Sequence, residues 1–124
     1  MRDLLFAFAK TWLGGLLLHF FFSYFSFAIP TERLLETDAL LAFYHPSPSY
    51  PLHILIVPKA KIKSLSDLNS KHKELMLGLF EAVSDLVERF DLRSVGYRLI
   101  ANGGQYQYVD YLHFHLISED YSGQ

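Results

Sequence analysis

The chain has 124 residues, 51% of them hydrophobic and 16% aromatic, and its formal net charge at pH 7 is −2. A chain of this length and composition can bury a sizeable core in one domain, which excludes wholesale disorder. The weak net charge gives no basic surface for a long nucleic acid, and the absence of cysteine excludes disulfides, zinc–thiolate sites and cysteine nucleophiles.

Near the N-terminus, residues 12–29 contain no charged side chain. As a helix they would span roughly 27 Å, close to the hydrocarbon thickness of a bilayer, and they show no amphipathic stripe. We therefore predict a hydrophobic N-terminal segment at 1–29, which makes a single-pass membrane protein of undecided orientation, and a folded domain at 30–124. Two alternatives stay open: a secreted protein cleaved near Ala28, and a cytoplasmic protein in which the segment packs on the domain.

The folded domain is predicted to be α+β. Five segments have the apolar runs or the alternation typical of strands: residues 33–36, 39–44, 52–57, 96–102 and 109–118. A short helical turn is expected at 62–68. Apolar side chains recur at helical spacing through residues 70–90, with Ser70 as the expected N-cap. This order predicts an antiparallel sheet with one long helix on one face, preceded by the hydrophobic N-terminal helix.

The last predicted strand carries the chemistry. Because alternate side chains of a strand share a face, Tyr111, His113 and His115 are expected to point to one side of the sheet. His53 joins them if its strand lies beside the last one. The imidazole of His113, at the centre of this row, could attack a phosphorus or carbonyl centre while its neighbours orient it. The turn at residues 102–105 either cradles an anion with its backbone N–H groups or only connects two strands.

These residues resemble the histidine triad (HIT) family of nucleotide hydrolases and transferases. Four blocks match in order between residues 29 and 118: Ile29-Pro30 with Leu41-Ala42-Phe43, Pro51-Leu52-His53 with Ile56-Val57-Pro58-Lys59, Gly96-Tyr97-Arg98 ending at Asn102, and the histidine-rich strand. The family signature His-x-His-x-His reads here Tyr111-Leu112-His113-Phe114-His115.

The resemblance implies a mechanism and a role for each matching position. His113 would attack the α-phosphorus of a nucleotide and form a nucleotidyl-histidine intermediate, which water resolves. His115 and His53 would contact phosphate oxygens and stabilise the charge that develops there. Asn102 would lie near the substrate, and Gln105 and Gln107 would reach the phosphate or the leaving group. The resemblance also implies a homodimer, and no cofactor is expected.

Two departures from the family pattern bear on substrate binding. Tyr111 replaces the first histidine of the signature, although its hydroxyl could still supply one hydrogen bond. His45 stands where many members place the acidic residue that holds the ribose hydroxyls.

Three classes of function therefore remain. The leading hypothesis is an enzyme that cleaves a nucleoside phosphoramidate, or a related nucleotide ester or anhydride, through His113. The alternative is a catalytically weakened HIT-like domain that binds a nucleotide or a partner and is tethered to a membrane. The third is a zinc site formed by His53, His113 and His115.

Overall fold

The computed structural model describes residues 33–123. The predicted membrane segment at residues 12–29, the cleavage site near Ala28 and the domain boundary at Pro30 lie outside this range, so they stay predictions. Within residues 33–123, no helix combines the length and the apolar character needed to cross a bilayer.

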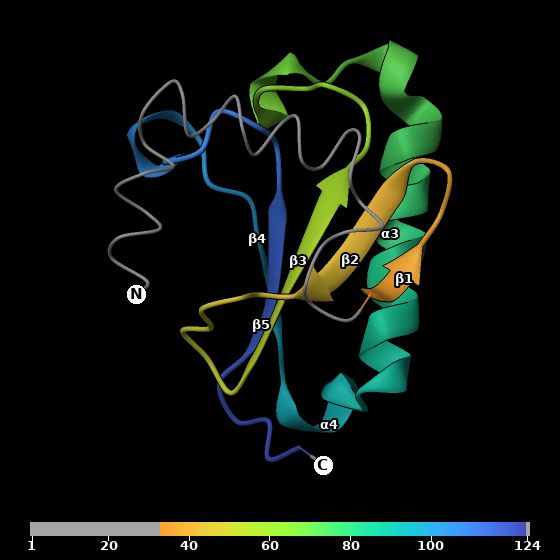
Figure 1. Ribbon diagram of the computed structural model, residues 1–124. Coiled ribbons are helices and arrows are strands. Elements are labelled where there is room, and N and C mark those ends of the chain that lie inside the picture. The colour runs from red at the N-terminus through yellow and green to blue at the C-terminus, as the bar shows by residue number, and fades with distance from the viewer. Residues whose placement is uncertain (1–32, 124) are drawn as a thin grey trace.

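The domain is a five-stranded antiparallel sheet with one long helix on one face (Figure 1). The strands are β1 (Arg33–Glu36), β2 (Leu40–Tyr44), β3 (Leu52–Pro58), β4 (Arg98–Ile100) and β5 (Phe114–Ser118). They are arranged in the order β1-β2-β3-β5-β4, so β3 and β5 are neighbours although they are far apart in the chain. The predicted α+β fold is confirmed.

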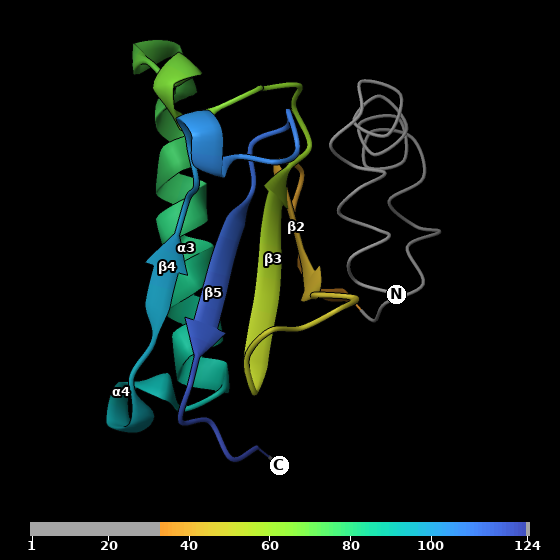
Figure 2. The ribbon, with the colours of Figure 1, turned by 90° about the vertical axis from the view of Figure 1, so that its left-hand side faces the viewer.

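The helix α3 (Lys73–Arg89) covers one face of the sheet, as the two views show together (Figures 1 and 2). It buries one apolar stripe against the strands, made by Leu79, Ala82, Val83, Leu86 and Val87. A four-residue helix, α4 (Leu92–Val95), follows it and leads into β4. The predicted N-cap at Ser70 is wrong. Asn69 caps a short 3₁₀ helix at Ser70–His72 instead. Its side-chain oxygen accepts the N–H of Lys71, and the backbone N–H of Asn69 donates to His72 Nδ1.

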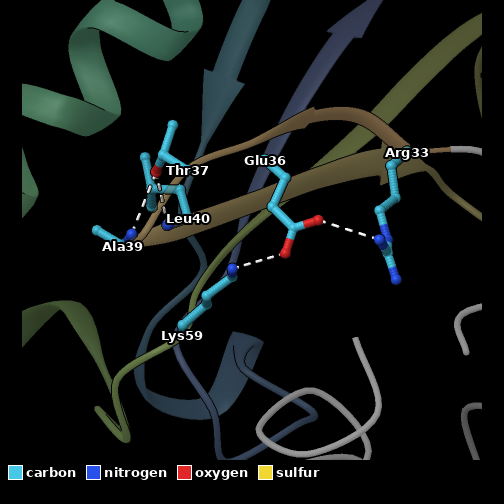
Figure 3. A network of polar contacts seen from close by, with 6 residues as sticks. All are labelled: Arg33, Glu36, Thr37, Ala39, Leu40 and Lys59. Atoms are coloured by element: carbon cyan, nitrogen blue, oxygen red, sulfur yellow. Dashed lines mark hydrogen bonds and ion pairs between the residues drawn. The ribbon is translucent and has the colours of Figure 1, made fainter. Parts of the chain in front are cut away.

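The β1–β2 hairpin is held by polar contacts at its turn (Figure 3). The Thr37 hydroxyl oxygen accepts the N–H groups of Ala39 and Leu40, at 3.2 and 3.0 Å. Glu36 bridges Arg33 on its own strand and Lys59 just after β3, at 3.1 and 2.6 Å. These ion pairs are partly exposed, so they tie the edge of the sheet together without adding much stability.

The opposite face of the sheet carries a second, smaller apolar cluster. Its buried members are Leu41, Phe43, Val57 and Tyr111. Tyr111 reaches this cluster from a segment that precedes β5, because β5 begins only at Phe114.

The prediction of strands at 96–102 and 109–118 is therefore wrong in its bounds. Residues 107–113 bond to the segment that follows β3 rather than to a neighbouring strand: the N–H of Leu112 donates to the carbonyl of Ile62 at 2.8 Å. Just before Leu112, the N–H of Tyr111 donates to the carbonyl of Val109, and this tight turn breaks the extended conformation. Only residues 114–118 are left to pair with β3 and β4.

Candidate active site

His113 lies immediately before β5, and one hydrogen bond fixes where its proton sits. Its Nδ1 is 2.8 Å from the carbonyl oxygen of Tyr111. A carbonyl oxygen can only accept, so Nδ1 carries the hydrogen and the neutral ring keeps a lone pair on Nε2. Burial lowers the pKa of His113, and the bond to the Tyr111 carbonyl opposes this in part. The ring is therefore neutral at pH 7, with Nε2 as a nucleophilic nitrogen.

His53 and His115 form a second fixed unit on the neighbouring strands β3 and β5. The N–H of Ser49 donates to His53 Nδ1 at 3.1 Å, so the proton of the neutral His53 ring is on Nε2. That nitrogen lies 2.8 Å from His115 Nδ1, which must therefore accept, and the proton of His115 is on its own Nε2. The result is a neutral donor, His115 Nε2–H, on the ring next to the nucleophile; the His113 and His115 ring centroids are 5.0 Å apart.

His45, just after β2, completes a row of four imidazoles. Its ring stacks on that of His53 at 4.3 Å between centroids, and its Nδ1 accepts the N–H of Ser47 at 2.9 Å. Burial, with a smaller contribution from His45, lowers the pKa of His53 to about 4. Burial and then the neighbouring histidines lower the pKa of His115 to about 3. The His53–His115 pair is thus uncharged at neutral pH.

These rings open onto a pocket of about 260 Å³. Six of the eight residues proposed from the sequence line it: His45, His53, Asn102, Gln107, His113 and His115. Within the described part of the chain, the pocket wall contains no carboxylate and no lysine or arginine, so its polar groups are imidazoles, amides and hydroxyls. Three tyrosines, Tyr50, Tyr106 and Tyr108, supply flat surfaces suited to a ring-shaped ligand.

Two residues proposed from the sequence are not brought to this pocket. Gln105 is exposed on a short 3₁₀ helix, Gly104–Tyr106. Tyr111 is only 2% exposed, and its hydroxyl donates to the carbonyl of Pro58 at 2.8 Å on the far side of the apolar cluster. Its backbone carbonyl, rather than its side chain, touches the site through His113.

Gln107 is fixed in the pocket wall by its own amide. Its Nε2 donates to two backbone carbonyls, those of Lys63 at 2.7 Å and Val109 at 2.9 Å. Two carbonyl acceptors identify this atom as the nitrogen, because an amide oxygen could not donate to either.

Ser49 and Tyr50 also line the pocket, although no pattern in the sequence marked them as site residues. Both lie in the loop between β2 and β3, where Pro46, Pro48 and Pro51 force the chain back over His53. The density of prolines so close before a candidate histidine is the signal that could have identified them.

The zinc alternative does not fit this arrangement. Among residues 33–123, no group of three or more histidine, aspartate or glutamate side chains is placed to hold a metal ion. The physical reason is that His53 Nε2 and His115 Nδ1 are directed at each other, so they are occupied by a hydrogen bond rather than converging on one point.

Comparison with known proteins finds relatives that are described as HIT or HIT-like proteins. The family model described as the HIT domain matches residues 26–122. An uncharacterised HIT-like protein of Helicobacter pylori is 35% identical over 94 residues, which cover 74% of this chain and 88% of that protein. The purine nucleoside phosphoramidase of Escherichia coli is 32% identical over 91 residues, which cover 72% of this chain and 76% of the enzyme.

Solved structures of HIT family proteins have a similar fold. A HIT family hydrolase from Legionella pneumophila superimposes with a TM-score of 0.72 at 30% identity, covering 84% of this chain and 92% of that one. A histidine triad protein from Clostridium difficile gives 0.71 at 30% identity, covering 80% and 88%.

Proposed function

Because the chain belongs to the histidine triad (HIT) family, we propose that it hydrolyses a nucleoside phosphoramidate, or a related nucleotide ester or anhydride, through a covalent nucleotidyl-His113 intermediate. The observation that carries the proposal is the hydrogen bond from His113 Nδ1 to the Tyr111 carbonyl, because it leaves the Nε2 lone pair available for attack. The relatives support the reaction class, since one is a phosphoramidase and another a HIT family hydrolase.

In the proposed first step, His113 Nε2 attacks the α-phosphorus and the bond to the leaving group breaks. His115 Nε2–H donates to a phosphoryl oxygen, where negative charge accumulates. His53 acts through His115, because the Nε2–H of His53 donates to His115 Nδ1. This hydrogen bond holds the His115 ring in one tautomer. Water then attacks the nucleotidyl-histidine, releases the nucleotide and restores the neutral His113 ring.

The remaining pocket residues are proposed to hold the nucleotide. Asn102, two residues after the end of β4, offers its amide to the sugar or phosphate. His45 packs on His53 and accepts from Ser47, so we assign it the support of the His53 ring rather than the ribose contact made by an acidic residue in other members. Gln105 and Tyr111 are given no contact with the nucleotide, because neither lines the pocket.

The test uses adenosine 5′-phosphoramidate with the purified chain and the His113→Ala variant. We expect the wild-type protein to release AMP and to yield a trapped adenylyl-protein after rapid quench in an alkaline denaturant, because the P–N bond of a nucleotidyl-histidine is labile in acid. The variant should lose several powers of ten in kcat and form no adduct, because a covalent nucleophile cannot be replaced by its neighbours. His72→Gln is the matched control, since His72 ends the 3₁₀ helix just before α3 and lies outside the pocket.

Near-normal turnover by His113→Ala would refute the covalent assignment. Tight nucleotide binding without turnover by the wild-type chain would instead favour the alternative, a domain that only binds its ligand.

We also propose that the chain forms a homodimer. In the described residues, β4 ends the sheet on one side, and an unpaired strand edge is a ready surface for a second copy. Val95 and Tyr97 beside this edge are 37% and 47% exposed, which is unusual for large apolar side chains next to a sheet. Sedimentation equilibrium of the wild-type chain and of Tyr97→Asp tests this. A monomeric wild-type chain would refute it.

A further inference from the structure

We infer that Gln107 discriminates between leaving groups, because it can offer only a hydrogen-bond acceptor to the substrate and so favours a leaving group that bears an N–H. This inference rests on the proposed function and adds to it a residue that determines specificity. The resemblance implied that Gln107 reaches either the phosphate or the leaving group; this inference selects the leaving group and the kind of hydrogen bond.

The starting observation is that the amide nitrogen of Gln107 is already committed. A primary amide has two hydrogens on nitrogen, and here two backbone carbonyls, of Lys63 and Val109, accept from that nitrogen. Both acceptors belong to the main chain, so neither can turn away or become a donor. The side chain thus has one polar atom left for a ligand, the oxygen Oε1.

An acceptor in this position does not suit a phosphate oxygen. Gln107 Oε1 and the phosphate oxygen would both present lone pairs and repel each other. The nearest rings are neutral, and the described lining residues include no cation that could offset this repulsion. Hydrogen-bond donors for the phosphoryl group are available elsewhere in the pocket, at His115 Nε2–H and the Asn102 amide. What Oε1 can bind is a group that carries a hydrogen.

The leaving group of a phosphoramidate is such a group. When His113 Nε2 bonds to phosphorus, the P–N bond breaks and its electron pair stays on the nitrogen, which takes one proton from water and departs as an amine. The water that later resolves the intermediate adds its hydroxyl to phosphorus and releases one proton, so one water is consumed overall. The leaving nitrogen bears a hydrogen throughout, and Gln107 Oε1 can accept from it as the P–N bond breaks. A phenolate or phosphate leaving group has no hydrogen to donate.

The test compares two substrates that share the adenylyl group and therefore form the same intermediate. One is adenosine 5′-phosphoramidate, and the other is the 4-nitrophenyl ester of AMP, whose leaving group lacks a donor. The quantity measured is kcat/KM, which reports steps up to departure of the leaving group and not the shared hydrolysis. The variant is Gln107→Met, which keeps the length of the side chain and removes both amide functions. Gln105→Met is the matched control, because Gln105 is an exposed glutamine two residues away.

For Gln107→Met we expect kcat/KM to fall about tenfold with the phosphoramidate and less than about threefold with the nitrophenyl ester, since one hydrogen bond is lost in one transition state only. Gln105→Met should alter neither. Loss of the two amide bonds to Lys63 and Val109 could also loosen the loop, but that effect would slow both substrates equally, and an equal fall would overturn the inference. No change with either substrate would overturn it as well.

The outcome separates this inference from the proposal on which it rests. If the wild-type chain turns over neither substrate, the proposed function fails and this role of Gln107 fails with it. If the wild-type chain turns over both through His113 and the ratio is unchanged in Gln107→Met, only the role of Gln107 is refuted.

Discussion

Replacing Tyr111 with phenylalanine should destabilise the domain measurably although it removes a single oxygen atom. That oxygen belongs to a side chain that is 2% exposed, and it donates to the Pro58 carbonyl at 2.8 Å. The ring itself stays in the cluster with Leu41, Phe43 and Val57, so little apolar burial is lost. The cost is the hydrogen bond plus the desolvation of a carbonyl left without this donor, about 1–2 kcal/mol in the free energy of unfolding. For a domain of this size that corresponds to a fall in Tm of roughly 5–15 °C.

Urea unfolding followed by circular dichroism measures the effect as a change in the midpoint at constant m-value. Tyr106→Phe is the matched control for stability, because Tyr106 is 77% exposed and its change should fall within about 0.5 kcal/mol of wild type. The reasoning is refuted if the two variants are equally stable. Tyr111→Phe should also lower kcat more than it changes KM, since the Tyr111 carbonyl that orients His113 is held in place through this side chain.

The remaining predictions concern the same cluster, the titrating side chains and the N-terminal segment. Tyr111→His should cost more stability than Tyr111→Phe, because an imidazole is too short to reach the Pro58 carbonyl and brings a polar ring against apolar neighbours; equal stability of the two variants would contradict this. The free energy of unfolding should be flat above about pH 7 and fall as the pH drops from 6.5 toward 4. The folded-state pKa values of His53 and His115, about 4 and about 3, lie below the ordinary 6.5, so between these values the unfolded chain binds more protons than the folded one. Glu36→Gln should leave that slope unchanged above pH 5, since Lys59 lowers the pKa of Glu36 below 4.5, and a slope that disappears in this variant would show that carboxylates cause it. The acidic limb of kcat/KM should lie below pH 6.5, because burial lowers the pKa of His113, and a limb centred above that value would count against His113 as the neutral nucleophile. Finally, the full chain should stay in the membrane fraction through an alkaline carbonate wash if residues 12–29 anchor it, and its release at full length would refute the anchor.

The sequence was sufficient to predict the fold and to suggest that His53, His113 and His115 come together. The period of two in a strand put His53 on the face away from the core, and the pairing of β3 with β5 brings it within 2.8 Å of His115. The pairing itself stayed a condition, since nothing local to either segment specifies which strands are adjacent; the resemblance to the HIT family implied only that His53 and His115 contact the same phosphate.

The same period put Tyr111 on the face of His53 and Leu112 on the face of the helix, as in the structure, but it could not show that residues 107–113 are not a strand. Their conformation is set by hydrogen bonds to residues 58–63, among them Leu112 to Ile62 and Gln107 to Lys63. Such contacts join segments that are far apart in the chain and leave no periodic trace in either one. The position of the Gln107 amide, and with it the acceptor character of that side chain, could therefore be learned only from the structure.

The imidazoles form two hydrogen-bonded units, His53 with His115 and His113 by itself, and the main chain fixes the direction of each. A backbone N–H at Ser49 can only give a proton, and a backbone carbonyl at Tyr111 can only receive one, so neither direction can be reversed by rotating a ring. A ligand in this pocket consequently meets an asymmetric pattern, with an accepting nitrogen on His113 and a donating one on His115, and two ligands related by exchange of donor and acceptor would not bind alike. Side-chain substitutions at a distance cannot invert that asymmetry. Removing a main-chain donor releases half of it: Ser49→Pro deletes the N–H that orients His53, so the His53–His115 pair could exchange donor and acceptor while His113 stays as it is.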